Sequence, residues 1–360
     1  MVLIVSEISR RLAIAALAPM VGGAVAANLA GNSATRTDEP DHHQHEPAHT
    51  AGSAHAGFRS GTSVDNAANG FHPTALLRDF DGGKISRLPD GRTLREWTLT
   101  ATEKSIEVAP GVTMPAWTYN GRVPGPTLRA TEGDRLRITL VNESSHPHTI
   151  HFHGVHAPEV DGVAGLGPGL IQPGGRTVYE FDALPFGLHP YHCHVTPLAA
   201  HIAKGLYGTL LIDPKAGRPA ADELVMVMNG FDTNFDRANE LYAVNSIPFA
   251  YMSEPVRVKL GELIRIYLVN ILEYDLINSF HVHGNFFDWY PTGTSLRPAE
   301  YTDTVMLCQG QRGILELRFG SRGRFMFHAH QSEFAELGWM GFFEVGSGAT
   351  PSDASHEGGL

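Results

Sequence analysis

One sequence pattern occurs twice in this chain, once in each half. Residues 133–154 run from a segment of alternating polar and apolar residues to the motif His-x-His-Gly, and residues 261–284 repeat this order. A second His-x-His motif comes later in each half, at residues 192–194 and 328–330. Such internal similarity at matched positions predicts two similar domains, each contributing the same kind of histidine pair.

The alternation itself indicates the secondary structure. In Arg135–Val141, Arg-Leu-Arg-Ile-Thr-Leu-Val, every second residue is apolar, which is the period of a β-strand. No long stretch of helical periodicity competes with it, and 39 Gly and 23 Pro supply many turns. We therefore expect an all-β fold, with domain 1 at 92–214, domain 2 at 218–347 and a tail at 348–360.

The N-terminal segment resembles an export signal. Arg10 and Arg11 precede an apolar run over residues 12–27, and Ser9-Arg10-Arg11-Leu12 is similar to a twin-arginine signal. The alternative is an uncleaved membrane anchor, but Pro19 weakens a spanning helix. We expect an exported protein, periplasmic or extracellular, with a signal at 1–27 and no stable membrane span in the mature chain.

Residues 28–91 are poor in apolar clusters and rich in Ala, Gly, Asp and His. We expect a His-rich flexible linker, acting either as a solvated tail or as a weak metal scavenger.

Charge and residue counts exclude several function classes. The formal net charge of −11 argues against a nucleic-acid partner, since such partners are held by cationic side chains. Two Cys among 360 residues cannot form a disulfide framework or a Cys-rich zinc site. The 20 His are too many for scattered core residues. If metal is bound, imidazole does most of the binding.

The paired histidines share faces of strands. Residues i and i+2 of a strand point the same way, so each His-x-His motif presents two imidazoles together. The four pairs give eight imidazoles: His151, His153, His192, His194, His281, His283, His328 and His330.

Strand parity predicts a second site. Cys193 lies between His192 and His194, so its sulfur points to the opposite face, as does His148. His201 follows within reach of Cys193 across a loop. One Cys and two His form the ligand set of a blue-copper electron-transfer site. The Cys193–His194 peptide would then connect this copper to the histidine cluster through a few covalent bonds.

These motifs together resemble a known family. Residues 148–154 read His-Thr-Ile-His-Phe-His-Gly, residues 192–194 read His-Cys-His, and residues 119–127 read Tyr-Asn-Gly-Arg-Val-Pro-Gly-Pro-Thr. The chain resembles a two-domain, laccase-like multicopper oxidase with type 1 copper in its first domain, related to copper nitrite reductases. The resemblance covers about residues 92–347 and implies two cupredoxin-like Greek-key β-sandwich domains.

The resemblance implies four coppers per subunit. His148, Cys193 and His201 would bind the type 1 copper, with Leu206, which cannot coordinate, at the axial position. A missing axial ligand in an apolar site favours Cu(I) and raises the potential. His151 and His281 would bind the type 2 copper. The type 3 pair would be bound by His153, His192, His194, His283, His328 and His330.

Domain 2 departs from domain 1 at the type 1 positions. Asn278, Ala329, Phe334 and Trp339 stand where domain 1 has His148, Cys193, His201 and Leu206. The resemblance therefore implies no type 1 copper in domain 2, with Phe334 and Trp339 packing in the core. It also implies a homotrimer in which the trinuclear cluster forms between domain 1 of one subunit and domain 2 of the next.

Two further residues carry expectations. By resemblance, Asp161 is the acidic residue near the type 2 copper and acts as a proton relay; the alternative is a turn aspartate before Gly162. Cys308 lies in an expected strand and is interpreted as a buried thiol.

The leading functional hypothesis is an oxidase that takes single electrons from a small reducing substrate, phenolic, aromatic or a metal ion, and reduces dioxygen to water. A copper nitrite reductase is the nearest alternative, but that family has Asp where His151 stands and lacks the His192-Cys193-His194 and His328-x-His330 patterns. A third hypothesis is a non-catalytic copper storage or tolerance protein, but it does not explain why Cys193 connects the two groups of ligands.

Overall fold

The computed structural model describes residues 64–346. The expected signal at 1–27, the expected linker up to residue 63 and the tail from residue 347 lie outside the described residues. Within them, no helix is long and apolar enough to cross a membrane.

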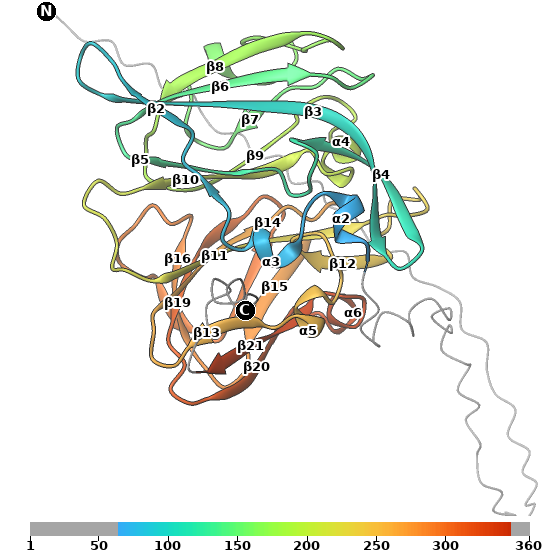
Figure 1. The fold of residues 1–360 in the computed structure, drawn as a ribbon, viewed down its shortest axis with the longest axis vertical. Coiled ribbons are helices and arrows are strands. Elements are labelled where there is room, and N and C mark those ends of the chain that lie inside the picture. Colours follow the sequence, from blue (N-terminus) through green and yellow to red (C-terminus); the bar gives the residue numbers. More distant parts are fainter. Residues whose placement is uncertain (1–63, 347–360) are drawn as a thin grey trace, which may run out of the picture. The chain divides into compact units, whose positions relative to one another are not determined.

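Domain 1 is built from two facing sheets (Figure 1). One sheet has the order β2-β3-β6-β8, with β4 paired to β3, and the other has the order β1-β5-β10-β9-β7. The strand bounds are β1 Phe80–Asp81, β2 Lys84–Arg87, β3 Thr93–Ala109, β4 Val112–Tyr119, β5 Thr127–Thr131, β6 Arg135–Asn142, β7 His151–Phe152, β8 Arg176–Asp182, β9 Gly187–His192 and β10 Tyr207–Asp213. A short 3-10 helix, η1, spans Pro158–Val160, and α4 spans Leu198–Ala203.

Domain 2 repeats this arrangement. Its sheets have the orders β12-β11-β14-β19-β16-β17 and β13-β21-β20-β15-β18. The strand bounds are β11 Asp222–Phe231, β12 Leu241–Val244, β13 Val256–Lys259, β14 Ile264–Asn270, β15 Ile277–Val282, β16 Phe287–Pro291, β17 Glu300–Thr302, β18 Thr304–Cys308, β19 Arg312–Leu317, β20 Gly323–His328 and β21 Met340–Gly346. Two short helices join them, α5 Ala250–Ser253 and α6 Ser332–Glu336.

Each sandwich encloses its own apolar core. Alternation along β6 buries Leu136, Ile138 and Leu140 against the facing sheet of domain 1. Strand β14, the matching element of domain 2, is buried along its whole length because its second face packs against domain 1 and the N-terminal segment. The all-β fold with two cupredoxin-like sandwiches is thus confirmed.

Part of the expected linker is folded. Residues 64–91 contain α2 (Asn66–Asn69), α3 (Pro73–Leu76) and strands β1 and β2, and the two helices lie between the domains (Figure 1). The Leu77 side chain is fully buried in the domain 2 core, and the backbone N–H of Val225 donates to the Leu77 carbonyl. The prediction of a flexible linker is therefore wrong for residues 64–91, because most of their apolar side chains, including Val64, Phe71, Leu76 and Leu77, are buried.

Candidate metal centres

The first candidate centre lies at one end of the domain 1 sandwich and joins three segments. His148 precedes β7 and is fixed by backbone hydrogen bonds with Ile171, Cys193 follows β9, and His201 lies in α4. All three side chains are buried. The Cys193 Sγ atom is 3.3 Å from His201 Nδ1 and 3.8 Å from His148 Nδ1, and the two nitrogens are 3.3 Å apart.

This triangle fits one metal ion. A metal with bonds of about 2.0 Å to nitrogen and 2.3 Å to sulfur, spread in a plane, spaces its ligand atoms about 3.5 Å apart. The three observed edges lie close to that value. One thiol sulfur and two imidazole nitrogens are also the donor set that selects a blue-copper ion.

Burial shifts the protonation of these ligands. It lowers the pKa of His148 to about 3 and that of His201 to about 4, so both imidazoles are neutral at neutral pH with lone pairs available for a metal. Burial also raises the pKa of the Cys193 thiol, although the Thr149 N–H donates to the sulfur at 3.4 Å. A bound cation would therefore have to hold Cys193 as the thiolate.

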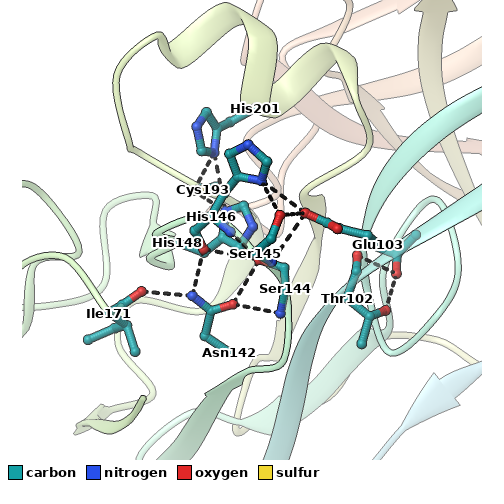
Figure 2. Close-up of polar contacts among 11 residues, drawn as sticks. Thr102, Glu103, Asn142, Ser144, Ser145, His146, His148, Ile171, Cys193 and His201 are labelled. Carbon is teal, nitrogen blue, oxygen red and sulfur yellow. Dashed lines mark hydrogen bonds and ion pairs between the residues drawn. The ribbon is translucent and has the colours of Figure 1, made fainter. Parts of the chain in front are cut away.

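The loop beside His148 is anchored by a polar network, shown in Figure 2. The Asn142 side-chain amide donates to the carbonyls of His146 and Ile171, both at 2.8 Å. The Ser144 hydroxyl also donates to the His146 carbonyl, at 3.0 Å. These bonds fix the backbone from which the His148 side chain projects.

Apolar groups close the site. The Trp117 ring lies 4.6 Å from the His201 ring and 5.2 Å from the His148 ring, centroid to centroid. Leu206 is fully buried, and its carbonyl accepts a hydrogen bond from the Cys193 N–H. Leu206 has no side-chain donor atom for a metal.

A second group of imidazoles lies on the other side of Cys193. His151 pairs directly with His192 across β7 and β9, and their ring centroids are 5.5 Å apart. The His194 ring lies 5.4 Å from the His151 ring, and His153 Nε2 lies 2.9 Å from His192 Nε2. The structure thus brings the four expected domain 1 histidines together.

Domain 2 holds a matching group. His281 pairs directly with His328 across β15 and β20, with ring centroids 5.3 Å apart. The His330 ring lies 5.5 Å from the His281 ring, and His283 Nε2 lies 3.0 Å from His328 Nε2. His283 and His330 are exposed. Among residues 64–346, no ring contact joins this group to the domain 1 group.

Hydrogen bonds to the second ring nitrogen orient several of these imidazoles. The Nδ1 atoms of His192 and His328 lie 2.9 Å and 2.6 Å from the carbonyl oxygens of the residues that follow them. His281 Nδ1 lies 2.8 Å from Thr304 Oγ1, and His151 Nδ1 lies 2.8 Å from Asp161 Oδ1. The Nε2 atoms are left for a metal, as is usual for ligating histidines.

The facing Nε2 pairs also fit bound cations. When Nδ1 carries the proton, Nε2 is an acceptor only, and two acceptors about 3 Å apart repel unless a cation lies between or beside them. Burial and neighbouring imidazoles lower the pKa of His153 to about 3 and that of His192 to about 4, and they lower the pKa of His283 and His328. These imidazoles are therefore neutral at neutral pH.

In domain 2, the positions equivalent to His148, Cys193, His201 and Leu206 hold Asn278, Ala329, Phe334 and Trp339, which do not form such a ligand set. Phe334 stacks on Tyr242 with centroids 4.0 Å apart, and Trp339 is fully buried against Phe280 and Phe327. Ala329 is also fully buried. Phe334 and Trp339 thus pack in the core, as expected.

The prediction for Cys308 is wrong, and the structure adds one contact, at His156, that no motif predicts. Cys308 was expected to be buried, but it is exposed, because β18 is an edge strand that buries Val305 and Leu307 and turns Met306 and Cys308 outward. His156 had no assigned role; its side chain is only 7% exposed and Nε2 lies 4.0 Å from Asp161 Oδ1. No sequence motif marks this contact, which depends on the loop between β7 and η1.

The fold and the paired sites define a two-domain, cupredoxin-like class of protein with ligand sets suited to copper. Two family models, both described as multicopper oxidase, match residues 100–217 and 218–349. A crystal structure of a multicopper oxidase is 63% identical, with a TM-score of 0.78, covering 79% of this chain and 100% of that one. The chain belongs to the multicopper oxidase family.

Curated relatives include proteins with different activities. A copper-containing nitrite reductase of Neisseria meningitidis serogroup A is 29% identical over 64% of this chain. Laccase-2 of Botryotinia fuckeliana is 38% identical over 36% of this chain. The chain spans 64% of the length of the first relative and 22% of the second.

Proposed function

We propose that this chain is a laccase-like oxidase that takes single electrons from a small reducing substrate and reduces dioxygen to water. The observation that carries the proposal is the placement of Cys193. Its sulfur faces His148 and His201, while the adjacent His192 and His194 face the imidazole group around His151. One short stretch of backbone therefore connects two candidate metal centres.

Copper bound at both centres would supply one-electron transfer and the reduction of dioxygen. We propose four coppers per subunit: one type 1, one type 2 and two type 3. The chain's own residues hold the ligands and manage protons. The His194 backbone N–H donates to Thr149 Oγ1 at 3.0 Å, which ties the segment that carries Cys193 to the segment that carries His148. Asp161, 2.8 Å from His151 Nδ1, is placed to hold and release a proton beside the imidazole group.

Nitrite reduction is the competing function, since a nitrite reductase is among the relatives. Three features favour the oxidase. His151 is present where the reductase family has Asp, His194 follows Cys193, and His328 is paired with His330. All contribute imidazoles to the two groups described above.

We further propose that the imidazole groups of two subunits meet in a homotrimer. Support comes from the exposure of His283 and His330. Exposed apolar side chains also occur at neighbouring strands of the same domain 2 sheet: Leu276, just before β15, is 86% exposed and Met306, in β18, is 66% exposed. A closed ring of head-to-tail contacts would bring each domain 2 group to a neighbour's domain 1 group.

Coexpression of two inactive variants tests this assembly. His153→Ala damages only the domain 1 group and His283→Ala only the domain 2 group. When equal amounts of the two variants mix randomly in a ring, about one subunit contact in four joins an intact domain 1 group to an intact domain 2 group. About one quarter of the wild-type activity should then be restored. No restoration in a mixed oligomer would contradict the shared cluster.

The metal inventory tests the proposed function. We expect four coppers per subunit, a blue thiolate absorption band, a type 2 signal in the EPR spectrum and dioxygen uptake with a phenolic donor. Two coppers per subunit with nitrite consumed would establish the reductase instead. Bound copper without a blue band would establish a storage role.

We also propose export, on the basis of the pattern around Arg10 and Arg11.

A further inference from the structure

A buried nitrogen without a hydrogen-bond partner lies next to the imidazole group of domain 1. The His156 side chain is 7% exposed, and its Nδ1 lies 3.1 Å from the Ala157 carbonyl oxygen. That contact places the proton on Nδ1 and leaves a lone pair on Nε2. Within the described residues, Nε2 has no hydrogen-bond partner.

This lone pair faces a carboxylate. His156 Nε2 lies 4.0 Å from Asp161 Oδ1, and the His156 ring packs edge-on against the His151 ring. The ligand atoms of His151, His156 and Asp161 all lie within 4.8 Å of one another. His156 Nε2 and Asp161 Oδ1 are both hydrogen-bond acceptors. Two such acceptors close together in a largely buried environment are destabilising unless a cation or a hydrogen-bond donor lies between them.

We propose that His156 and Asp161 form a binding site for a divalent cation of the zinc type, separate from the coppers. Zinc takes imidazole nitrogen at about 2.0–2.1 Å and carboxylate oxygen at about 2.0–2.2 Å, so its two ligands lie about 3.4 Å apart in a tetrahedral site. A small rotation of either side chain closes the present 4.0 Å separation to that value.

Access and charge favour a cation. Asp161 is 20% exposed, and His156 lines a surface depression together with Arg135 and three carboxylates, those of Glu159, Glu180 and Asp182. Glu180 and Asp182 are paired with arginines, whereas Glu159 has no ion pair within residues 64–346. Water reaching the partly exposed Asp161 carboxylate would complete the coordination of the cation.

Occupation of the site has a functional consequence, which rests on the proposed function. A cation on Asp161 would compete for the oxygen atom that accepts from His151 Nδ1. The carboxylate could then neither orient His151 nor release a proton. Zinc would therefore inhibit dioxygen reduction and leave the reduction of the blue centre by the donor unchanged.

Anomalous diffraction tests the site directly. Crystals of the copper-loaded full chain, soaked in zinc chloride and measured on both sides of the zinc absorption edge, are expected to show zinc between His156 Nε2 and Asp161 Oδ1. The peak should be absent in His156→Gln, whose blue absorption reports that the variant is folded. No zinc at this position in the wild type would overturn the proposal, whether or not the protein is an oxidase.

Inhibition supplies the second readout. The zinc concentration for half-inhibition of dioxygen uptake should rise about tenfold or more in His156→Gln, since loss of a ligand or its support costs that much affinity. His72→Gln is the matched control. His72 also lies beside a carboxylate, that of Glu254, but this pair is exposed to solvent. Equal inhibition of the wild type and His156→Gln would overturn the inhibitory role.

Discussion

The Oδ1 atom of Asp161 lies 2.8 Å from Nδ1 of His151, and this contact links a loop carboxylate to the imidazole group of domain 1. Asp161 follows η1 and is 20% exposed, so it reaches both solvent and the ring. The contact favours a relay role over that of a simple turn aspartate.

Replacing Asp161 by Asn removes the proton-holding group and keeps its size. We expect dioxygen reduction to slow about 100-fold, the lower end of what a positioned acid or base contributes. Copper content and anaerobic reduction of the blue band should stay as in the wild type. The exposed neighbouring substitution Glu159→Gln is the control. Unchanged oxygen uptake in Asp161→Asn would contradict the relay.

The two cysteines provide a matched pair of variants. Cys193→Ser should abolish the blue band, lower copper by one per subunit and eliminate oxidase activity, because a hydroxyl does not replace a thiolate ligand. Cys308 is exposed and outside both centres, so Cys308→Ser should keep all three properties. A blue band that survives in Cys193→Ser would contradict the assigned ligand.

We propose that the buried Leu206 side chain occupies the axial position of the Cys193 centre. Leu206→Met preserves side-chain volume, so we expect a loss of stability below about 1.5 kcal/mol. A thioether beside the metal should lower the reduction potential, measured by redox titration of the blue band. A potential equal to or above that of the wild type would show that the Leu206 side chain does not face the metal.

Glu223 connects the domains through Arg129 of domain 1 and through Arg265 and Tyr267 of domain 2. Burial raises the pKa of Glu223, but these hydrogen bonds and charges outweigh burial and lower it. A carboxyl with a lowered pKa in the folded state stabilises the protein above the unfolded value of about 4.3, and this stability is lost as the pH falls through the folded value.

Glu223→Gln should therefore lower the free energy of unfolding at pH 7 by about 1–3 kcal/mol. As the pH falls, the free energy of unfolding should also decrease less steeply in this variant than in the wild type. Chemical denaturation at several pH values measures both effects. The control is Glu262→Gln, since Glu262 forms only an exposed ion pair with Lys259. Equal losses in the two variants would refute the role of the buried network.

Sequence patterns predicted the elements whose periodicity is local. Alternation predicted a strand around Arg135–Val141, and β6 spans Arg135–Asn142. The i, i+2 spacing predicted which imidazoles would lie together, because the backbone pleat alone decides it. The burial of Phe334 and Trp339 also followed from the comparison of the two halves.

Other features depend on contacts between distant segments. Leu77 is buried only because domain 2 covers it, and nothing in the local sequence indicates this. The 4.0 Å approach of His156 to Asp161 depends on the path of the loop after β7. The exposure of Cys308 depends on the place of β18 at the sheet edge, although the alternation Val305, Met306, Leu307, Cys308 carried a signal for it.

The central claim is that electrons taken at the Cys193 centre reduce dioxygen completely to water. The most direct measurement is the number of phenolic donor molecules oxidised, one electron each, per dioxygen consumed, with hydrogen peroxide and nitrite assayed in parallel. The account predicts four donor molecules per dioxygen, no peroxide and no nitrite turnover. Consumption of nitrite with dioxygen left untouched would contradict it.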